Sequence, residues 1–444
     1  MTRTSRWVTA GRQNAPDIAV QKYGGSSLAT IDQVRLVART VAEKHRSGKS
    51  TVVVVSARGA ATDELLRNAD QAGRRCNGRE TDQLLATGEV ASAALLAIAL
   101  QDLGVPAISL TGTQAGIRTA GGHGSGVIAD IDTRRLRRIL ADGNVAVVAG
   151  FQGADDTGEV VTLGRGGSDT TAVALAAALG ARSCEICTDV AGVATADPRV
   201  VADARVLPTV DVAVMAEMSF AGARVLHPRA VELAARNCVE LHVRHSEVRH
   251  SEVQNSEGSS PAESRTIIHA GSEAVFENHG VVVAIAHDTD VARVLLRSGQ
   301  RGIDLATEIL EILSAHAVPV DLVTRSGPQE DESRMGFTIP RKDGDRAIPA
   351  VRKAVADLGA TMQVDKNVGK LSLIGMGLLN HPQYTARMLS ALTRADIPTS
   401  CLSTSQLRTS VVIPLDRVAS AVRLLHNEFG LNTGDLDPVS AASA

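Results

Sequence analysis

The chain has 444 residues, more than a single hydrophobic core usually serves, so two or three domains are expected. A net charge of -3 and an aromatic content of 2% argue against nucleic acid as a partner, because basic stripes and stacking rings are lacking. Residues 1–17 lack the apolar stretch of a secretory signal, and no apolar run predicts a membrane span. We therefore expect a cytoplasmic protein that has no membrane partner and binds a small molecule.

Strands and helices are predicted to alternate from residue 18 to residue 245, after a flexible tail at 1–17. The predicted strands are 18–22, 52–56, 107–110, 145–151, 184–188 and 239–243. The predicted helices are 34–44, 84–103, 133–140, 170–179 and 229–236. With 44% apolar residues, this order predicts an α/β domain whose mainly parallel sheet is sandwiched by helices. Ligands bind such sheets beyond the carboxyl ends of the strands.

Several predicted strands end in residues that suit anion binding. Lys22 precedes a Gly-Gly turn, Ser56 ends the second strand, and Thr188 and Asp189 end a later one. Each alone is typical of an ordinary turn. Their recurrence at one edge of the sheet favours a catalytic site.

A glycine run at residues 163–171, Leu-Gly-Arg-Gly-Gly-Ser-Asp-Thr-Thr, opens into an alanine-rich helix. Free amides at a helix start attract phosphate, and the guanidinium of Arg165 is a planar anion fork. The Asp169 carboxylate suits a metal ion or a substrate ammonium. Taken alone, the segment also fits a plain turn with Ser168 as the helix N-cap.

No metal site formed by the protein is predicted. Cys184 and Cys187 are three apart on a strand and so face opposite sides of the sheet, which favours two buried hydrophobic side chains. His245 and His250 belong to a short duplication at the start of a polar segment, 246–275, whose composition predicts a linker.

An internal repeat with a constant offset of 79 residues follows the linker, since the segment 306–319 resembles 385–398. Each copy has the order strand, helix, strand, strand, helix. The strands are 293–297, 320–324 and 335–339, then 371–376, 399–404 and 410–414; the helices are 305–316 and 347–358, then 384–394 and 419–429. We predict two small α+β domains, at 276–360 and 361–436, and a flexible tail at 437–444. They carry few catalytic groups, which favours ligand sensing or assembly.

The chain resembles the aspartate kinases of the amino acid kinase superfamily, followed by a tandem pair of ACT domains. The resemblance spans residues 18 to 435 and depends on four motifs: KYGGSS, GRGGSDTTA, TDV with ADPR, and VLHPRA. It implies the amino acid kinase fold, synthesis of 4-phospho-L-aspartate from L-aspartate and ATP with Mg²⁺, and a homo-oligomer assembled through the ACT domains. The reaction begins the pathway to lysine, threonine and methionine.

The resemblance also implies roles for residues at matching positions. The catalytic residues are Lys22, Arg165 and Asp169. Aspartate is held by Ser56, Thr62, Glu89, Phe151 and Arg165. ATP is held by Lys22, Tyr23, Gly24, Gly25, Gly166, Gly167, Ser168, Thr188, Asp189, Ala194, Asp197, Pro198, Arg199 and Arg224. No catalytic histidine is needed, because a carboxylate of pKa about 3.9 is already ionised at neutral pH; His227 is interpreted as a packed or capping residue.

Some positions depart from the family pattern. Ala194 replaces a tyrosine beside the nucleotide, and Arg224 replaces a lysine. In the effector region, Pro319 and Pro398 replace asparagines, a Gln-Asn pair becomes Arg325 and Ser326, and a glycine becomes Gln383.

The main interpretation is an aspartate kinase with altered feedback control. These departures leave two alternatives to it. One is a kinase for another acidic amino acid in a specialised pathway. The other is a catalytically weak, ACT-based regulatory subunit.

Overall fold

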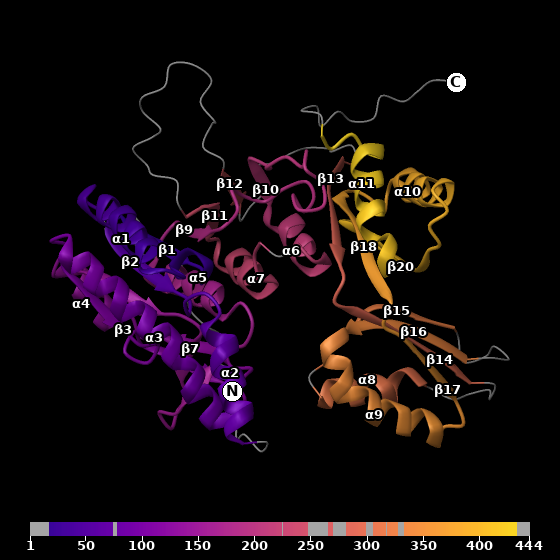
Figure 1. The fold of residues 1–444 in the computed structure, drawn as a ribbon, viewed down its shortest axis with the longest axis horizontal. Coiled ribbons are helices and arrows are strands. Elements are labelled where there is room, and N and C mark those ends of the chain that lie inside the picture. Colours follow the sequence, from indigo (N-terminus) through magenta and orange to yellow (C-terminus); the bar gives the residue numbers. More distant parts are fainter. Residues whose placement is uncertain are drawn as a thin grey trace, which may run out of the picture. The chain divides into compact units, whose positions relative to one another are not determined.

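The computed structural model describes residues 17–73, 78–223, 225–246, 265–269, 281–298, 305–316, 318–326 and 333–432. They form two compact units, coloured from indigo to yellow along the chain in Figure 1. The first unit takes residues up to 193, 207–212 and 225–272. The second takes residues 194–206, 213–224 and those from 273 onward.

An eight-stranded sheet forms the first unit, in the order β10-β12-β11-β9-β1-β2-β6-β3. Its strands are β1 (Ile18–Tyr23), β2 (Ser50–Val55), β3 (Ala107–Leu110), β6 (Val145–Ala149), β9 (Ser183–Thr188), β10 (Thr209–Asp211), β11 (Glu240–His245) and β12 (Arg265–His269). All neighbours are parallel except β11 and β12. The predicted mainly parallel sheet is confirmed.

Helices cover this sheet on both faces, as predicted. They are α1 (Ile31–Arg46), α2 (Ala61–Ala72), α3 (Gly78–Asp102), α4 (Arg134–Ala141), α5 (Gly167–Leu179) and α7 (Pro228–Asn237), with a short 3-10 turn at Ser26–Leu28. A small four-stranded sheet, which we did not predict, contains β4 (Ile117–Ala120), β5 (Val127–Ile131), β7 (Gln152–Ala154) and β8 (Val160–Thr162). Its strands of three to five residues are too short to show a clear alternation in sequence.

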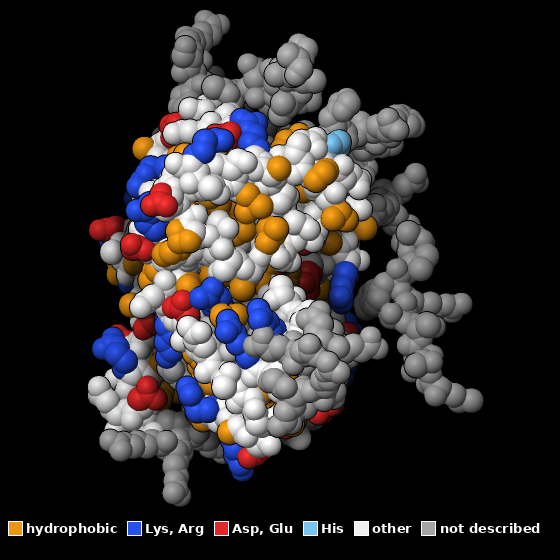
Figure 2. All heavy atoms as spheres, turned by 90° about the vertical axis from the view of Figure 1, so that its right-hand side faces the viewer, with side chains coloured by type: hydrophobic (Ala, Val, Ile, Leu, Met, Phe, Trp, Pro, Cys, Tyr) orange, Lys and Arg blue, Asp and Glu red, His pale blue; other side chains and the backbone are white. Residues whose placement is uncertain are grey.

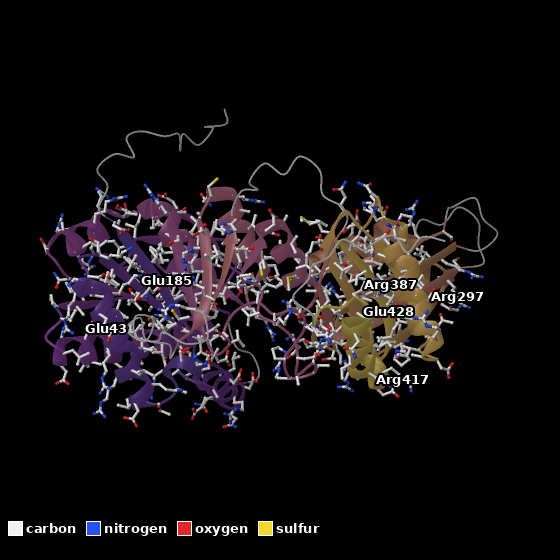
Figure 3. The ribbon with its side chains drawn as sticks, turned by 90° about the horizontal axis from the view of Figure 1, so that it is seen from above. Glu43, Glu185, Arg297, Arg387, Arg417 and Glu428 are labelled. Atoms are coloured by element: carbon white, nitrogen blue, oxygen red, sulfur yellow. The ribbon has the colours of Figure 1, made fainter. Side chains whose placement is uncertain are left out.

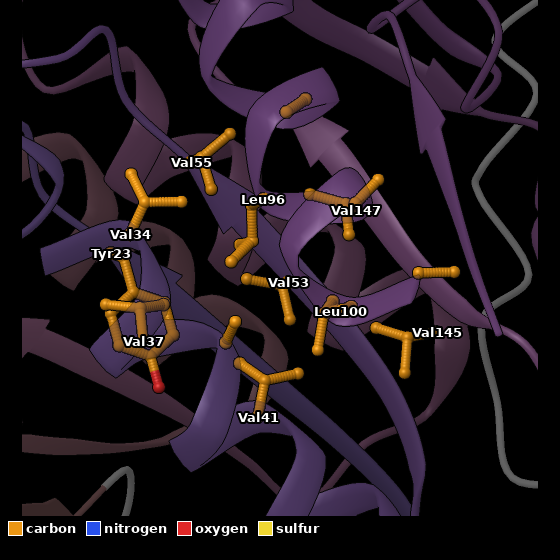
Figure 4. Close-up of a cluster of buried hydrophobic side chains, with 14 of the residues drawn as sticks. Tyr23, Val34, Val37, Val41, Val53, Val55, Leu96, Leu100, Val145 and Val147 are labelled. Atoms are coloured by element: carbon orange, nitrogen blue, oxygen red, sulfur yellow. The ribbon is translucent and has the colours of Figure 1, made fainter. Parts of the chain in front are cut away.

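Alternation along the strands sends successive side chains to different helical layers. Tyr23, Val53 and Val147 face α1 and α3 in one core cluster, where Leu96 and Leu100 of α3 pack against the strands (Figure 4). Lys22 faces the opposite side, where α5 packs on β1. The sheet thus separates a dry aliphatic core from the layer that carries the chemistry.

Helix α3 is the one helix in the described part of the chain that is long and apolar enough to cross a membrane. The prediction that no apolar run is long enough to span a membrane was wrong for residues 78–102. Leu96 and Leu100 are fully buried against the sheet, so the apolar character of α3 serves the core of the first unit.

A buried ion cluster connects three strands on the α1 side of the sheet. Glu185, labelled in Figure 3, contacts Lys44 at 2.5 Å, Arg244 at 3.2 Å and Gln21 at 2.8 Å. Burial raises the pKa of Glu185, and the two cations more than offset it, leaving the pKa at about 2. The cluster fixes the pairing of β1, β9 and β11.

The second unit contains two antiparallel four-stranded sheets, each with two helices. One has the order β15-β16-β14-β17, with β14 (Val291–Ser298), β15 (Asp321–Arg325), β16 (Ser333–Pro340), β17 (Thr361–Asp365), α8 (Leu305–Ala315) and α9 (Arg341–Asp357). The other has the order β13-β18-β20-β19, with β13 (Val281–Asp288), β18 (Val368–Met376), β19 (Ser400–Thr404), β20 (Arg408–Pro414), α10 (Pro382–Arg394) and α11 (Val418–Glu428), and a 3-10 turn at Leu415–Arg417. Basic and acidic side chains are interspersed on the face shown in Figure 2.

The two copies of the repeat match in backbone detail as well as in order. Leu322 and Cys401, 79 residues apart, both have positive φ values, of 51° and 52°. Both lie at an irregularity in an edge strand, β15 and β19. Positive φ is uncommon for such residues, so its recurrence supports the predicted repeat.

The expected boundary between residues 360 and 361 does not separate the two sheets. Strand β17 comes after the boundary and pairs with β14 of the first sheet, whereas β13 comes before it and pairs with β18 of the second. The predicted repeat has three strands in each copy and includes neither β13 nor β17. The fourth strand of each sheet pairs with a strand that is distant in the chain, so the local pattern does not predict it. Each sheet therefore takes strands from both predicted ranges.

The predicted continuous domain at 18–245 is also interrupted. The Oγ1 of Thr195 contacts His426 Nε2 at 2.9 Å, and the Thr195 carbonyl accepts a hydrogen bond from Ile285 at 2.8 Å. Residues 194–206 and 213–224, which include α6 (Val212–Ala221) except its first residue, therefore belong to the second unit. The predicted linker, apart from Ser246 and 265–269, and both predicted tails, apart from Asp17, lie outside the described residues.

Candidate active site

A buried ion pair lies where β1 ends and α5 begins. The Lys22 Nζ is 2.7 Å from the Asp169 Oδ1, and each side chain is 12% exposed. Lys22 comes from the strand and Asp169 from the first helical turn, so the pair connects two of the motifs singled out in the sequence. A cation held at the start of a helix favours the approach of an anion.

The turn after β1 is shaped by close backbone approach. A Cβ on Gly25 would lie 2.5 Å from the carbonyl oxygen of Ala57, so only glycine fits. A Cβ on Gly24 would lie 3.5 Å from the Lys22 Nζ. The two glycines thus bring the turns after β1 and β2 together and leave space beside the lysine ammonium.

Glu89 on α3 is a buried carboxylate with one free oxygen. It is 4% exposed, and its Oε1 accepts a hydrogen bond from the Ala57 amide at 3.0 Å. Its Oε2 is buried and has no hydrogen-bond partner. Burial raises the pKa of Glu89 to about 7. A carboxylate in this state suits a cationic group of a ligand, because the ligand supplies the missing partner.

The glycine loop between β8 and α5 holds two left-handed residues. Gly164 has φ of 72° and Gly166 has φ of 66°, and Gly166 is the N-cap of α5. Ser168, predicted as an N-cap, lies inside the helix instead. A Cβ on Gly150 would lie 2.8 Å from the Ser168 Cβ, so the serine packs against that glycine. No side chain caps α5, and its first amide, that of Gly167, donates to the Gly164 carbonyl at 3.0 Å, so the amides of Ser168 and Asp169 are the ones that suit an anion.

Phe151 adopts a left-handed conformation, with φ of 70°, just after β6. Its amide donates to the Oγ1 of Thr171, and its ring lies where a side chain on Gly167 would be. The predicted strand 145–151 therefore ends at Ala149. The strained residue ties the end of β6 to the start of α5.

Other predicted site residues lie on the elements around this region. Ser56 directly follows β2 and is partly exposed, Thr62 is in the first turn of α2, and the Arg165 side chain is exposed. Thr188 ends β9, and its hydroxyl donates to the Asp189 carboxylate at 3.0 Å. The carboxyl ends of β1, β2 and β9, neighbours in the sheet, all carry predicted residues.

One predicted ATP contact, that of Tyr23, differs from the structure, and five others stay predictions. The Tyr23 side chain is fully buried in the α1 layer, facing away from Lys22, so it cannot contact a nucleotide beside that lysine. Ala194, Asp197, Pro198 and Arg199 belong to the second unit, where Asp197 pairs with Arg199 at 2.8 Å. Arg224 lies outside the described residues.

Two groups of supporting residues were missed in the sequence. Asp82 of α3 is 1% exposed and accepts hydrogen bonds from the amide and hydroxyl of Thr162 and from the Gly124 amide. Arg229 of α7 donates to the carbonyl oxygens of Leu163 and Gly126. An acidic residue within an apolar helix was the available signal for Asp82; Arg229 lies in the motif VLHPRA without a visible role.

Comparisons with known proteins agree with this arrangement. The model of the amino acid kinase family matches residues 17–245, and an ACT domain model matches residues 371–429. This chain belongs to the amino acid kinase family. The Mycolicibacterium smegmatis aspartokinase is 41% identical over 422 residues, which cover 94% of this chain and 97% of that protein. The Geobacillus stearothermophilus aspartokinase is 40% identical over 415 residues, with 93% and 97% covered.

Solved structures support the same fold for this amino acid kinase. Escherichia coli aspartokinase III, in complex with aspartate and ADP, superposes with a TM-score of 0.76 at 24% identity, over 93% of this chain and 99% of that one. The aspartate kinase from Synechocystis has a TM-score of 0.51 at 35% identity, over 93% and 69%. The amino acid kinase fold with C-terminal ACT domains, expected from the motifs, is confirmed.

Proposed function

We propose that this chain transfers the γ-phosphoryl group of ATP to the side-chain carboxylate of L-aspartate, giving 4-phospho-L-aspartate. Its close similarity to aspartokinases over nearly the whole chain supports this function. The single observation that carries it is the combination of the Lys22–Asp169 pair with the half-satisfied Glu89. They are connected by contacts, since Glu89 holds Ala57, and Ala57 lies against Gly25.

Each group has a proposed role in this transfer. Lys22 neutralises the charge of the moving phosphoryl group, and Asp169 orients Lys22. The Glu89 carboxylate receives the ammonium of aspartate, and Arg165 its carboxylate, with Ser56 and Thr62 as hydroxyl donors. The attacking carboxylate is already ionised at neutral pH, so one of its oxygens bonds to phosphorus without a general base, while the bond to ADP breaks.

ATP and Mg²⁺ are the proposed cosubstrate and metal. No three His, Cys, Asp or Glu side chains among the described residues lie together as a metal site. Asp169 is already paired with Lys22, which leaves no free carboxylate pair there. We propose that Mg²⁺ arrives with the phosphates of ATP, since Mg²⁺ in such sites binds largely through substrate phosphates and water. The ion neutralises phosphate charge when bound.

A hydroxamate assay over a panel of acidic amino acids tests the proposal. We expect ATP-dependent product with L-aspartate and at most weak product with L-glutamate or N-acetylglutamate. Preference for another acid would favour the specialised kinase, and no turnover with any acid would favour the regulatory subunit. The ion pair at Lys22 and the free Glu89 oxygen favour an active aspartate kinase.

Arg165→Lys is expected to raise the aspartate KM by about tenfold, because a lysine cannot make the bidentate contact of a guanidinium. The ATP KM is expected to change by less than about threefold on the same reasoning. Initial-rate kinetics with each substrate varied in turn give both constants. An equal rise in both would assign Arg165 to the nucleotide.

Feedback control is expected to be weak. Arg325 adds a cation near the region where the family binds effectors, and Pro319 and Pro398 lack a backbone donor. We propose a dimer or larger homo-oligomer assembled through the ACT repeats, whose activity responds weakly to lysine, threonine or both. Titration of each effector against turnover, with the mass of the assembly measured in parallel, tests this; strong inhibition below about 1 mM would contradict it.

A further inference from the structure

The first turn of α7 packs directly on the glycine loop. A Cβ on Gly166 would lie 2.1 Å from the Cγ of His227 and 2.6 Å from its Cδ2. The imidazole therefore covers the one residue that ends the loop and caps α5. His227 is more than half buried, and this burial lowers its pKa below the usual value of a histidine.

Arg229, two residues later, holds the other end of the same loop. Its two terminal nitrogens donate to the Leu163 carbonyl at 2.5 Å and to the Gly126 carbonyl at 3.0 Å. One side chain thus joins the end of β8 to the loop between β4 and β5. His227 and Arg229 together contact residues 163 and 166, on either side of Arg165.

Apart from these two side chains, the loop is held by local contacts: the Gly167 amide donates to the Gly164 carbonyl at 3.0 Å, and the Gly166 carbonyl accepts from the amide and the hydroxyl of Thr170, each at 3.0 Å. Gly164 and Gly166 both have positive φ values, and glycine loses more backbone freedom on ordering than any other residue. The Arg165 side chain between them is exposed. A guanidinium that must meet a carboxylate needs its backbone held before the substrate arrives, since ordering one residue costs about 1–2 kcal/mol.

We propose that His227 and Arg229 are positioning residues, which hold the loop 163–166 so that Arg165 is ready to bind the amino acid substrate. This inference rests on the proposed function for the role of Arg165. The contacts that hold the loop are independent of that function.

His227 also has a purely structural contact. Its Nδ1 accepts a weak hydrogen bond from the Arg229 amide at 3.4 Å, which caps α7. An asparagine is a good N-cap but has no ring to cover Gly166. The variant His227→Asn therefore separates the two roles, since it keeps the cap and removes the contact with the loop.

The test compares His227→Asn and Arg229→Ala with Arg236→Ala, a matched control that lies exposed in the last turn of the same helix. We expect His227→Asn to keep the melting temperature and to raise the aspartate KM about tenfold, the cost of ordering one residue on binding. The ATP KM is expected to rise by less than the aspartate KM, because the phosphate contacts proposed for Lys22 and Gly24 lie outside this loop. Arg229→Ala is expected to do the same, Arg229→Lys to rescue it in part, and Arg236→Ala to match the parent.

Amide hydrogen exchange gives a readout that needs no activity. Residues 163–168 are expected to exchange faster in His227→Asn than in the parent, and at the parent rate in Arg236→Ala. Unchanged exchange in the loop, or equal changes in the two KM values, overturns the proposal. If the parent enzyme does not phosphorylate aspartate, faster exchange still supports the holding contacts, whereas the proposed function alone fails.

Discussion

Replacing Lys22 by alanine is expected to lower kcat by at least about 100-fold, the usual cost of removing one charge-stabilising group from an active site. The Nζ is 2.7 Å from Asp169, in the first turn of α5, and borders the space beside Gly24, where we propose that the transferred phosphoryl group binds. Turnover per active site, measured at saturating aspartate and ATP, decides this. Near-normal turnover would sink the assignment of Lys22.

Stability must be measured beside turnover, because the pair is largely buried. Removing one partner of a buried pair leaves an uncompensated charge and costs about 3–5 kcal/mol. The double variant Lys22→Ala with Asp169→Asn removes that charge, so it is expected to recover stability and remain inactive. Lys49→Ala, which breaks the exposed pair with Asp17, is the control and is expected to retain activity.

Replacing Glu89 by glutamine is expected to abolish tight aspartate binding and to stabilise the empty enzyme. The amide keeps an oxygen for the Ala57 amide but has no charge for the substrate ammonium. Losing a charged partner in a buried site costs about 2–5 kcal/mol, so the aspartate KM should rise at least about 30-fold. The substitution also removes a buried carboxylate whose Oε2 has no hydrogen-bond partner in the empty site, which is why the empty enzyme is expected to gain stability.

The stability gain depends on pH in a defined direction. Burial raises the pKa of Glu89 from 4.5 to about 7, because the folded protein favours the protonated carboxyl group. This preference contributes its full stability to the fold below pH about 4.5, and the contribution is lost as the pH rises through about 7. Above that range the ionised form costs about 3 kcal/mol. Glu89→Gln should therefore melt several degrees higher than the parent at pH 8 and at nearly the same temperature at pH 4.5.

Binding follows the same titration. The substrate ammonium selects the ionised carboxylate, so kcat/KM for aspartate should rise with pH through about 7 in the parent and stay flat in Glu89→Gln. Glu43→Gln, an exposed carboxylate on α1 labelled in Figure 3, is the matched control and should keep the parent profile. A parent profile that is flat from pH 6 to 8 would show that Glu89 does not bind the ammonium.

The sequence by itself determined the local features of this protein. Alternating strand and helix patterns predicted the parallel sheet, and the offset of 79 residues predicted the paired α+β domains. The glycines near Lys22 and Asp169 identified two loops that the structure brings together. These features are readable because periodicity and turn chemistry depend on residues close together in the chain.

Only the tertiary structure decided which side chains face the site and which strands pair. Tyr23 stands next to Lys22 in the motif but points into the opposite layer, because strand side chains alternate. Strand β13 belongs to the sheet of the second repeat, and strand β17 to the sheet of the first. Residues 194–206 belong to the second unit through hydrogen bonds between residues that are distant in the chain. The free oxygen of Glu89 and the cover of His227 over Gly166 likewise arise from burial and contact across long separations, which no local pattern encodes.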